Sequence, residues 1–137
     1  MVTVFVEKFP VTKFLGIEID SISNGRAVFN LPFKEELSFD KKTIQAGIVG
    51  TLLDFAGAAS AMSQLPEGWV IISLGYDIHF ISPARGNSLT GIGEVVRQGK
   101  GNIVSRVEIF ANGDGEPVLC ATGTVTTRGV NPNQGSD

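Results

Sequence analysis

A long apolar segment in the middle of the chain most limits how it can fold. Over residues 43–65 the apolar side chains fall on nearly every side of a helix, and Pro66 follows directly, so we predict a helix capped by Thr43 or Asp40. Asp54 is the only charged residue in this segment. A carboxylate in apolar surroundings costs several kcal/mol unless a partner satisfies it. We therefore expect a surrounded helix, in which Asp54 either has a hydrogen-bond partner or performs chemistry.

Alternating apolar and polar residues on both sides of this segment predict six strands. These strands cover residues 17–22, 26–31, 70–80, 89–97, 102–110 and 116–127. Asn24-Gly25 joins the first two and is typical of a tight hairpin turn. In the third strand, the even-numbered residues from Val70 to Phe80 are predicted to face the helix. The chain is therefore predicted to be a single α+β domain over residues 1–128, followed by a flexible tail over 129–137.

One curved antiparallel sheet cannot cover a helix on all sides, which predicts a partner protomer at a two-fold interface. The predicted helix start, Gln45-Ala46-Gly47, exposes backbone N–H groups and the positive end of the helix dipole, where an oxyanion could bind. Gln45 and Asp54 point to opposite sides of the helix and lie roughly 13 Å apart along its axis. A site that uses both would therefore need Asp54 of one protomer and the helix start of another.

Composition and residue counts exclude several classes of site. The net charge of -3 and pI near 5.1 argue against nucleic-acid binding. Cys120, the only cysteine, is expected to be a small buried side chain, and no metal-ligand spacing is present. His79, the only histidine, lies roughly 20 Å from Ser73 along its strand, which excludes a Ser-His-Asp triad. The polar interruptions in the helix argue against a membrane span, and without a signal-like N-terminus we expect a cytoplasmic protein.

The helix and third strand together resemble a known family. The segment Gln45-Ala46-Gly47, six residues, Asp54, then Ala56-Gly57-Ala58-Ala59, precedes the strand from Ser73 that ends in Ser82-Pro83-Ala84. This pattern resembles the hotdog-fold acyl-CoA thioesterases of the phenylacetate-degradation (PaaI-like) group, within the 4-hydroxybenzoyl-CoA thioesterase superfamily. The resemblance covers roughly residues 14–128. It implies a hotdog fold, with a curved antiparallel sheet wrapped around one long central helix.

The resemblance also implies the chemistry of the site. It implies a thioester hydrolase, active between two protomers, in which Asp54 acts as general base or nucleophile. Ala46 would supply the oxyanion N–H, flanked by Gln45 and Gly47 where the family commonly has His-Gly-Gly. Ser73 would position the acid or the water. The coenzyme A phosphates of the substrate would meet basic residues on exposed turns, for which the candidates are Arg85, Arg97 and Lys100.

We therefore expect an acyl-CoA thioesterase that works as a homodimer, paired further into a homotetramer, without a separate cofactor or metal. Two alternatives remain open from the sequence. One is a hotdog domain that binds acyl-CoA as a sensor or carrier without cleaving it. The other is a hotdog dehydratase or hydratase, which would need a catalytic histidine at the position where Gln45 stands.

Overall fold

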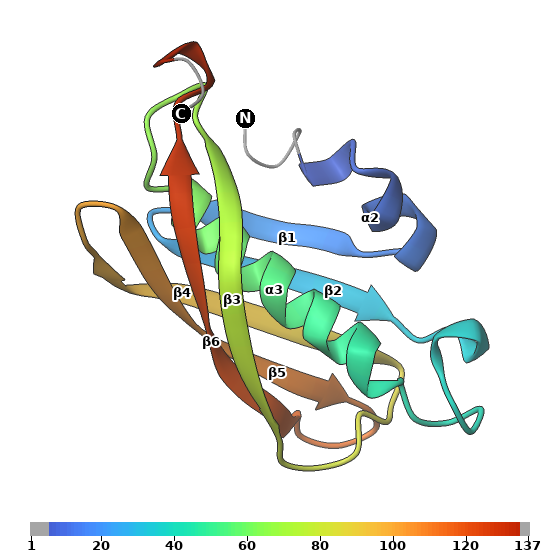
Figure 1. Cartoon of the computed structure of the whole chain (residues 1–137). Coiled ribbons are helices and arrows are strands. Elements are labelled where there is room, and N and C mark those ends of the chain that lie inside the picture. Colours follow the sequence, from blue (N-terminus) through green and yellow to red (C-terminus); the bar gives the residue numbers. More distant parts are fainter. Residues whose placement is uncertain (1–5, 135–137) are drawn as a thin grey trace.

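Six antiparallel strands form one sheet that curves around a long helix in the computed structural model, which describes residues 6–134 (Figure 1). The strands are β1 (Glu18–Ser23), β2 (Arg26–Pro32), β3 (Val70–Phe80), β4 (Ser88–Gln98), β5 (Asn102–Asn112) and β6 (Val118–Val130). Their order across the sheet is β1-β2-β4-β5-β6-β3. The long helix is α3 (Ala46–Met62), and shorter helical turns are α2 (Pro10–Leu15), η1 (Glu35–Leu37) and η2 (Pro132–Gln134). The predicted α+β class is confirmed, and β1 and β3 form the two edges of the sheet.

The strand predictions hold to within a few residues. Asn24 and Gly25 both have positive φ, 51° and 80°, which is the backbone of the tight turn predicted between β1 and β2. β6 continues to Val130, two residues beyond the predicted domain boundary, and residues 135–137 of the predicted tail lie outside the described residues. The helical turn α2 was not predicted from the sequence. No helix within residues 6–134 is both long and apolar enough to cross a membrane.

The prediction that α3 starts at Thr43, capped by Thr43 or Asp40, is wrong. Thr43 is in extended backbone and forms a β-bridge with Arg85, so the helix begins only at Ala46. Gln45 is the N-cap, and its side-chain oxygen accepts a hydrogen bond from the Gly47 N–H at 2.7 Å. Asp40 instead accepts hydrogen bonds from the N–H groups of Lys42 and Thr43. The bond from Lys42 is the main reason that the pKa of Asp40 lies below its usual value.

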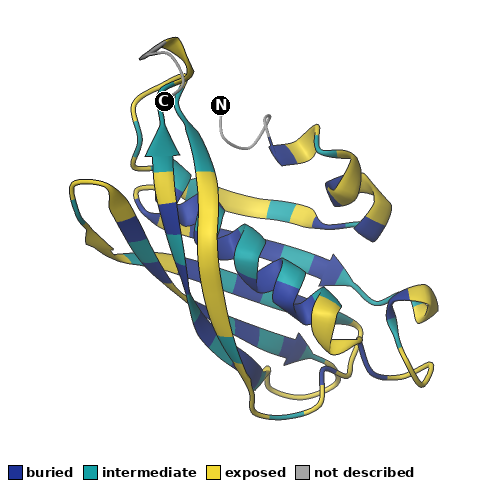
Figure 2. Cartoon of the chain, viewed as in Figure 1, coloured by how far each residue is buried: buried dark blue, intermediate teal, exposed yellow. Residues whose placement is uncertain are grey.

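Glycine allows α3 to lie very close to the sheet. A Cβ atom on Gly93 of β4 would overlap the carbonyl oxygen of Ala56, and one on Gly57 would overlap Val125 of β6. Leu52 and Leu53 are fully buried and lie against Gly91 and Gly123 of the sheet. Most of α3 is buried or intermediate in Figure 2. The core therefore lies between one side of α3 and the concave face of the sheet.

The prediction for the two faces of β3 is wrong for its first half, because a β-bulge interrupts the strand. Ser73 pairs with Thr127 and Gly75 with the next residue, Thr126, so Leu74 is an extra residue on β3. One extra residue reverses which side chains face the helix. Ser73 therefore points at α3, whereas His79 lies on the outer face, and the prediction that these two share a face is also wrong.

Candidate functional site

Asp54 lies in the middle of α3 on a half-buried side of the helix, away from the tightly buried contact with the sheet. The Ser73 hydroxyl donates a hydrogen bond to Asp54 Oδ1 with an oxygen–oxygen distance of 2.6 Å. A hydroxyl that donates to a carboxylate forms a short, strong hydrogen bond and fixes the orientation of the acid. The Thr51 hydroxyl, one turn earlier on α3, donates instead to the Gly47 carbonyl oxygen. The structure therefore brings together Asp54 of α3 and Ser73 of β3, which the family resemblance implied as the acid and the residue that positions it.

A hollow of about 210 Å³ opens beside this pair, between α3, β3 and the N-terminal segment. Among the described residues that line it, only Asp54 and Ser73 have polar side chains, and they are hydrogen-bonded to each other. Phe9 and Phe55 line one side, with ring centroids 6.3 Å apart and an edge-to-face angle of 87°. The sequence did not indicate Phe9 as a lining residue, because nothing in its local pattern places it beside the helix.

The start of α3 has an exposed backbone donor. Of its first N–H groups, the one on Gly47 is occupied by the side chain of its own N-cap, Gln45. The Ala46 N–H has no hydrogen-bond partner among the described residues, and Ala46 is exposed. A second hollow of about 270 Å³ lies against Ala46 and is also lined by Phe39 and Phe80. Gln45 thus orders the helix start and leaves the neighbouring donor available.

Asp54 and Ala46 are not brought together within one protomer. They are eight residues apart on the same helix, which corresponds to roughly 12 Å along the axis at about 1.5 Å per residue. A nucleophile and an oxyanion donor must each lie about 3 Å from the reacting group. The two halves of the candidate site are therefore separate in the single chain.

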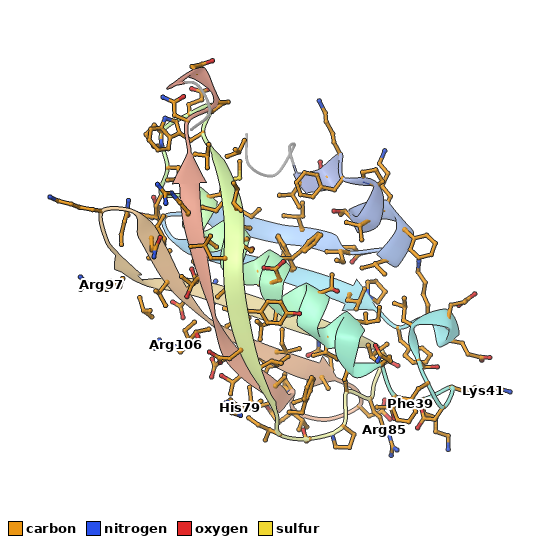
Figure 3. All side chains as sticks on the ribbon, viewed as in Figure 1. Phe39, Lys41, His79, Arg85, Arg97 and Arg106 are labelled. Atoms are coloured by element: carbon orange, nitrogen blue, oxygen red, sulfur yellow. The ribbon has the colours of Figure 1, made fainter. Side chains whose placement is uncertain are left out.

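The three candidate basic residues also lie apart. Arg85 is near the start of α3, where its Nε donates a hydrogen bond to Thr43 Oγ1 at 2.7 Å and its Nη2 lies 3.7 Å from Asp40 Oδ2. Arg97 lies near the opposite end of β4 (Figure 3), and Lys100 lies in the turn between β4 and β5. An 11-residue strand spans roughly 33 Å between its ends at about 3.3 Å per residue. Arg85 therefore cannot hold the same phosphate as the other two within one protomer.

The remaining titratable candidates lie away from the Asp54–Ser73 pair, although Cys120 lines the hollow beside Ala46. Cys120 is buried, as predicted, and burial raises the pKa of its thiol to about 11. His79 is exposed on the outer face of β3, away from Asp54. Within residues 6–134, no group of three or more His, Cys, Asp or Glu side chains is arranged to hold a metal ion.

A family model for the thioesterase superfamily matches residues 42–118 of the chain, a range that includes Gln45, Asp54 and Ser73. The chain belongs to the thioesterase superfamily. The sheet wrapped around α3 is accordingly the hotdog fold of these proteins, as the sequence resemblance implied.

Several solved structures are similar to this protein over nearly the whole chain. A thioesterase family protein from Silicibacter pomeroyi is 30% identical, with a TM-score of 0.91 over 95% of this chain and 96% of that one. The PaaI protein of the Escherichia coli phenylacetic acid degradation operon is 25% identical, with a TM-score of 0.80 over 91% and 87%. A Bacillus halodurans protein, solved with CoA, shares the fold at 23% identity, with a TM-score of 0.79 over 93% and 86%.

Proposed function

We propose that this protein is an acyl-CoA thioesterase that hydrolyses an acyl- or aryl-CoA thioester to a carboxylic acid and free CoA. Besides membership of the superfamily, one observation supports this proposal. The Ser73 hydroxyl donates a hydrogen bond to Asp54 Oδ1 at the edge of an apolar hollow. This arrangement fixes a carboxylate beside a space that an acyl group can fill. We also propose that the protein is located in the cytoplasm.

The orientation of Asp54 suggests the role of each oxygen. Because Oδ1 accepts from Ser73, Oδ2 is left to accept a proton from water. The water oxygen then attacks the thioester carbonyl carbon, and the negative charge that forms on the carbonyl oxygen is bound by a backbone N–H. The carbon–sulfur bond breaks, and the CoA thiolate takes up the proton. In the alternative mechanism, Asp54 attacks the carbonyl carbon directly, the carbon–sulfur bond breaks and the CoA thiolate leaves. Water then hydrolyses the resulting anhydride, which releases the carboxylic acid, restores the Asp54 carboxylate and supplies the proton that the thiolate takes up.

The N–H in this proposal is that of Ala46 in a second protomer, which makes the active unit a homodimer. The β3 edge supports the dimer because no described strand pairs with its free side, and Figure 2 shows it exposed over most of its length. Among its exposed side chains, Leu74, Tyr76 and Phe80 are large hydrophobic ones, each between 48% and 55% exposed. An open, apolar edge strand favours pairing with another strand. Assembly of such dimers into a tetramer remains a prediction.

The position of a two-fold axis can be derived from this requirement. If Asp54 faces Ala46 of the second protomer, the axis passes beside residue 50, which is midway between them. On β3, Ser73 lies beside Asp54 and Phe80 lines the hollow beside Ala46, and their midpoint falls at Tyr76 and Asp77. These two midpoints are neighbours, because a Cβ on Gly50 would lie 2.9 Å from the Tyr76 hydroxyl oxygen. Helix and strand thus agree on one axis position.

The same dimer would need a site for the CoA phosphates, and Arg85, Arg97 and Lys100 remain the candidates for it. The CoA in the Bacillus halodurans relative supports a CoA ester as the ligand class. Arg85 lies nearest to the helix start that supplies the proposed oxyanion donor. Arg97 and Lys100 would come from the opposite end of a protomer.

The decisive experiment is hydrolysis of acyl-CoA by the Asp54→Asn variant, measured as thiol release. Loss of the general base is expected to lower kcat by about 100-fold to 10,000-fold. Asp114→Asn is the control, because Asp114 is an exposed carboxylate between β5 and β6 that lines none of the hollows. Full activity of Asp54→Asn would refute the proposal. Tight acyl-CoA binding by the parent protein without any thiol release would favour the sensor or carrier alternative.

A further inference from the structure

The hollow beside Asp54 extends along α3 in one direction. Asp54, Ala58 and Met62 are spaced four residues apart and therefore lie on one side of the helix, and all three line the hollow. Ala58 lies roughly 6 Å and Met62 roughly 12 Å from Asp54 along the axis, at about 1.5 Å per residue. A group attached to a carbonyl at Asp54 would pass Ala58 first and reach Met62 later.

Beyond Asp54 and Ser73, the walls of the hollow are hydrocarbon. Apart from Asp54 and Ser73, the lining side chains within residues 6–134 come only from Val, Ile, Phe, Ala and Met residues. The two polar side chains already share a hydrogen bond. A hydroxyl at the far end of a bound acyl group would therefore meet no polar side chain among the described residues. Leaving such a hydroxyl buried and unpaired lowers affinity.

The volume of the hollow limits the size of the group. A buried apolar cavity of about 150 Å³ is large enough to bind benzene, which has six carbon atoms. By proportion, about 210 Å³ holds about eight carbon atoms. A ring with a short linker and an unbranched chain of that length both meet this limit. The edge-to-face rings of Phe9 and Phe55 offer an aromatic wall to either.

Resting on the proposed thioesterase function, we propose that the protein selects acyl-CoA thioesters whose acyl group is an unsubstituted hydrocarbon of about eight carbon atoms, and that Ala58 and Met62 determine this limit. Ala58 sets the width of the hollow near the thioester, and Met62 closes its far end. The preferred substrates then include octanoyl-CoA and phenylacetyl-CoA, whereas 4-hydroxyphenylacetyl-CoA is disfavoured.

The test measures kcat/KM for saturated acyl-CoA esters from two to twelve carbons and for the phenylacetyl and 4-hydroxyphenylacetyl pair. Each added methylene should raise kcat/KM about fourfold up to the limit near eight carbons, from the free energy of burying one methylene. The ring hydroxyl should lower kcat/KM by about 10-fold to 100-fold.

Two substitutions test the residues themselves. Met62→Ala should move the optimum to longer chains, whereas Ala58→Leu should move it to four carbons or fewer; Ala58→Val gives a milder shift if the leucine variant does not fold. Leu65→Ala is the control, since Leu65 lies just beyond α3 and lines a different hollow, beside Trp69. It should leave the chain-length profile unchanged. Equal effects of Met62→Ala on all chain lengths would overturn the inference, as would a flat profile in the parent.

Binding separates this inference from the proposed function. Calorimetric Kd values of Asp54→Asn for the same CoA esters should follow the same chain-length order, because that variant keeps the hollow. If the parent releases no thiol from any ester but this order is found, the proposed hydrolysis fails and the assignment of the hollow stands. If hydrolysis is found and neither kcat/KM nor Kd depends on the acyl group, the inference fails and the proposed hydrolysis stands.

Discussion

A mixed dimer offers a direct test of a site shared between protomers. Ala46→Pro removes only the proposed oxyanion N–H, because proline is well tolerated at the first position of a helix. Gln45 has φ -64° and ψ 140°, the extended conformation that a residue before proline adopts, so the substitution should not disturb the cap. Asp54→Asn removes the acid from the other half of the site. Each variant alone should therefore fold normally and lose activity.

The expected activities follow from symmetry. Loss of one oxyanion donor lowers kcat by about 100-fold to 1,000-fold, so each homodimer is nearly inactive. A dimer of one Asp54→Asn chain and one Ala46→Pro chain has one site with neither group and one site with both. The purified mixed dimer should therefore have about half of the parent activity per dimer, and a random mixture, in which half of the dimers are mixed, about a quarter.

The assay is thiol release by mixed dimers purified through two different affinity tags after co-expression. Ala46→Ser is the control for the side chain, since serine keeps the N–H group, and it should retain activity. If the verified mixed dimer is no more active than the two homodimers, the site does not combine Asp54 and Ala46 across the interface. Parent-like activity of Ala46→Pro alone would refute the oxyanion role of that N–H.

Two further predictions concern the fold. Gly93→Ala should destabilise the protein by about 1–3 kcal/mol, because its Cβ would overlap the Ala56 carbonyl oxygen. The melting temperature should then fall by about 3–10 °C. Gly113→Ala is the control, because no atom lies within 4 Å of the added Cβ, and it should change the melting temperature little. An unchanged melting temperature for Gly93→Ala would contradict the close packing of α3. The Cys120 thiol should resist alkylation until the protein unfolds. Burial in the folded state raises the pKa of this thiol from 9.0 to about 11, so folding stabilises the uncharged thiol relative to the thiolate. The stability that depends on the uncharged thiol is therefore complete below pH 9 and is lost as the pH rises through 11. Rapid alkylation of native protein at pH 8 would contradict its burial.

The elements that could be predicted from the sequence are those with a strong local pattern. The apolar run over 43–65 and the Asn24-Gly25 turn each indicate one structure, and both are present, although the helix is shorter. The start of α3 was placed wrongly, because tertiary pairing of Thr43 with Arg85 outweighs the local preference of threonine for a cap. Sequence spacing alone cannot detect such a contact between residues 42 positions apart.

The sequence likewise predicted some residues of the candidate site and missed others. Asp54 stood out as a lone charge, and the family resemblance implied Ser73 as the residue that positions it. The predicted alternation of β3 nevertheless put Ser73 on the wrong face, because a bulge has no reliable signal in a strand that is otherwise regular. Phe9 was missed because it reaches the hollow from a segment far from α3 in sequence.

The extra residue at Leu74 has a consequence for how such a site can be inherited or transplanted. Deleting it would turn the first half of β3 over, so that Ser73 pointed to solvent while every residue of the site remained in the sequence. A homologue could thus keep both the acid and the serine and still lack their hydrogen bond. Chain length between Ser73 and Gly75 is therefore as much a part of the site as the side chains are. An engineer grafting it onto another edge strand must move Ser73-Leu74-Gly75 as one unit.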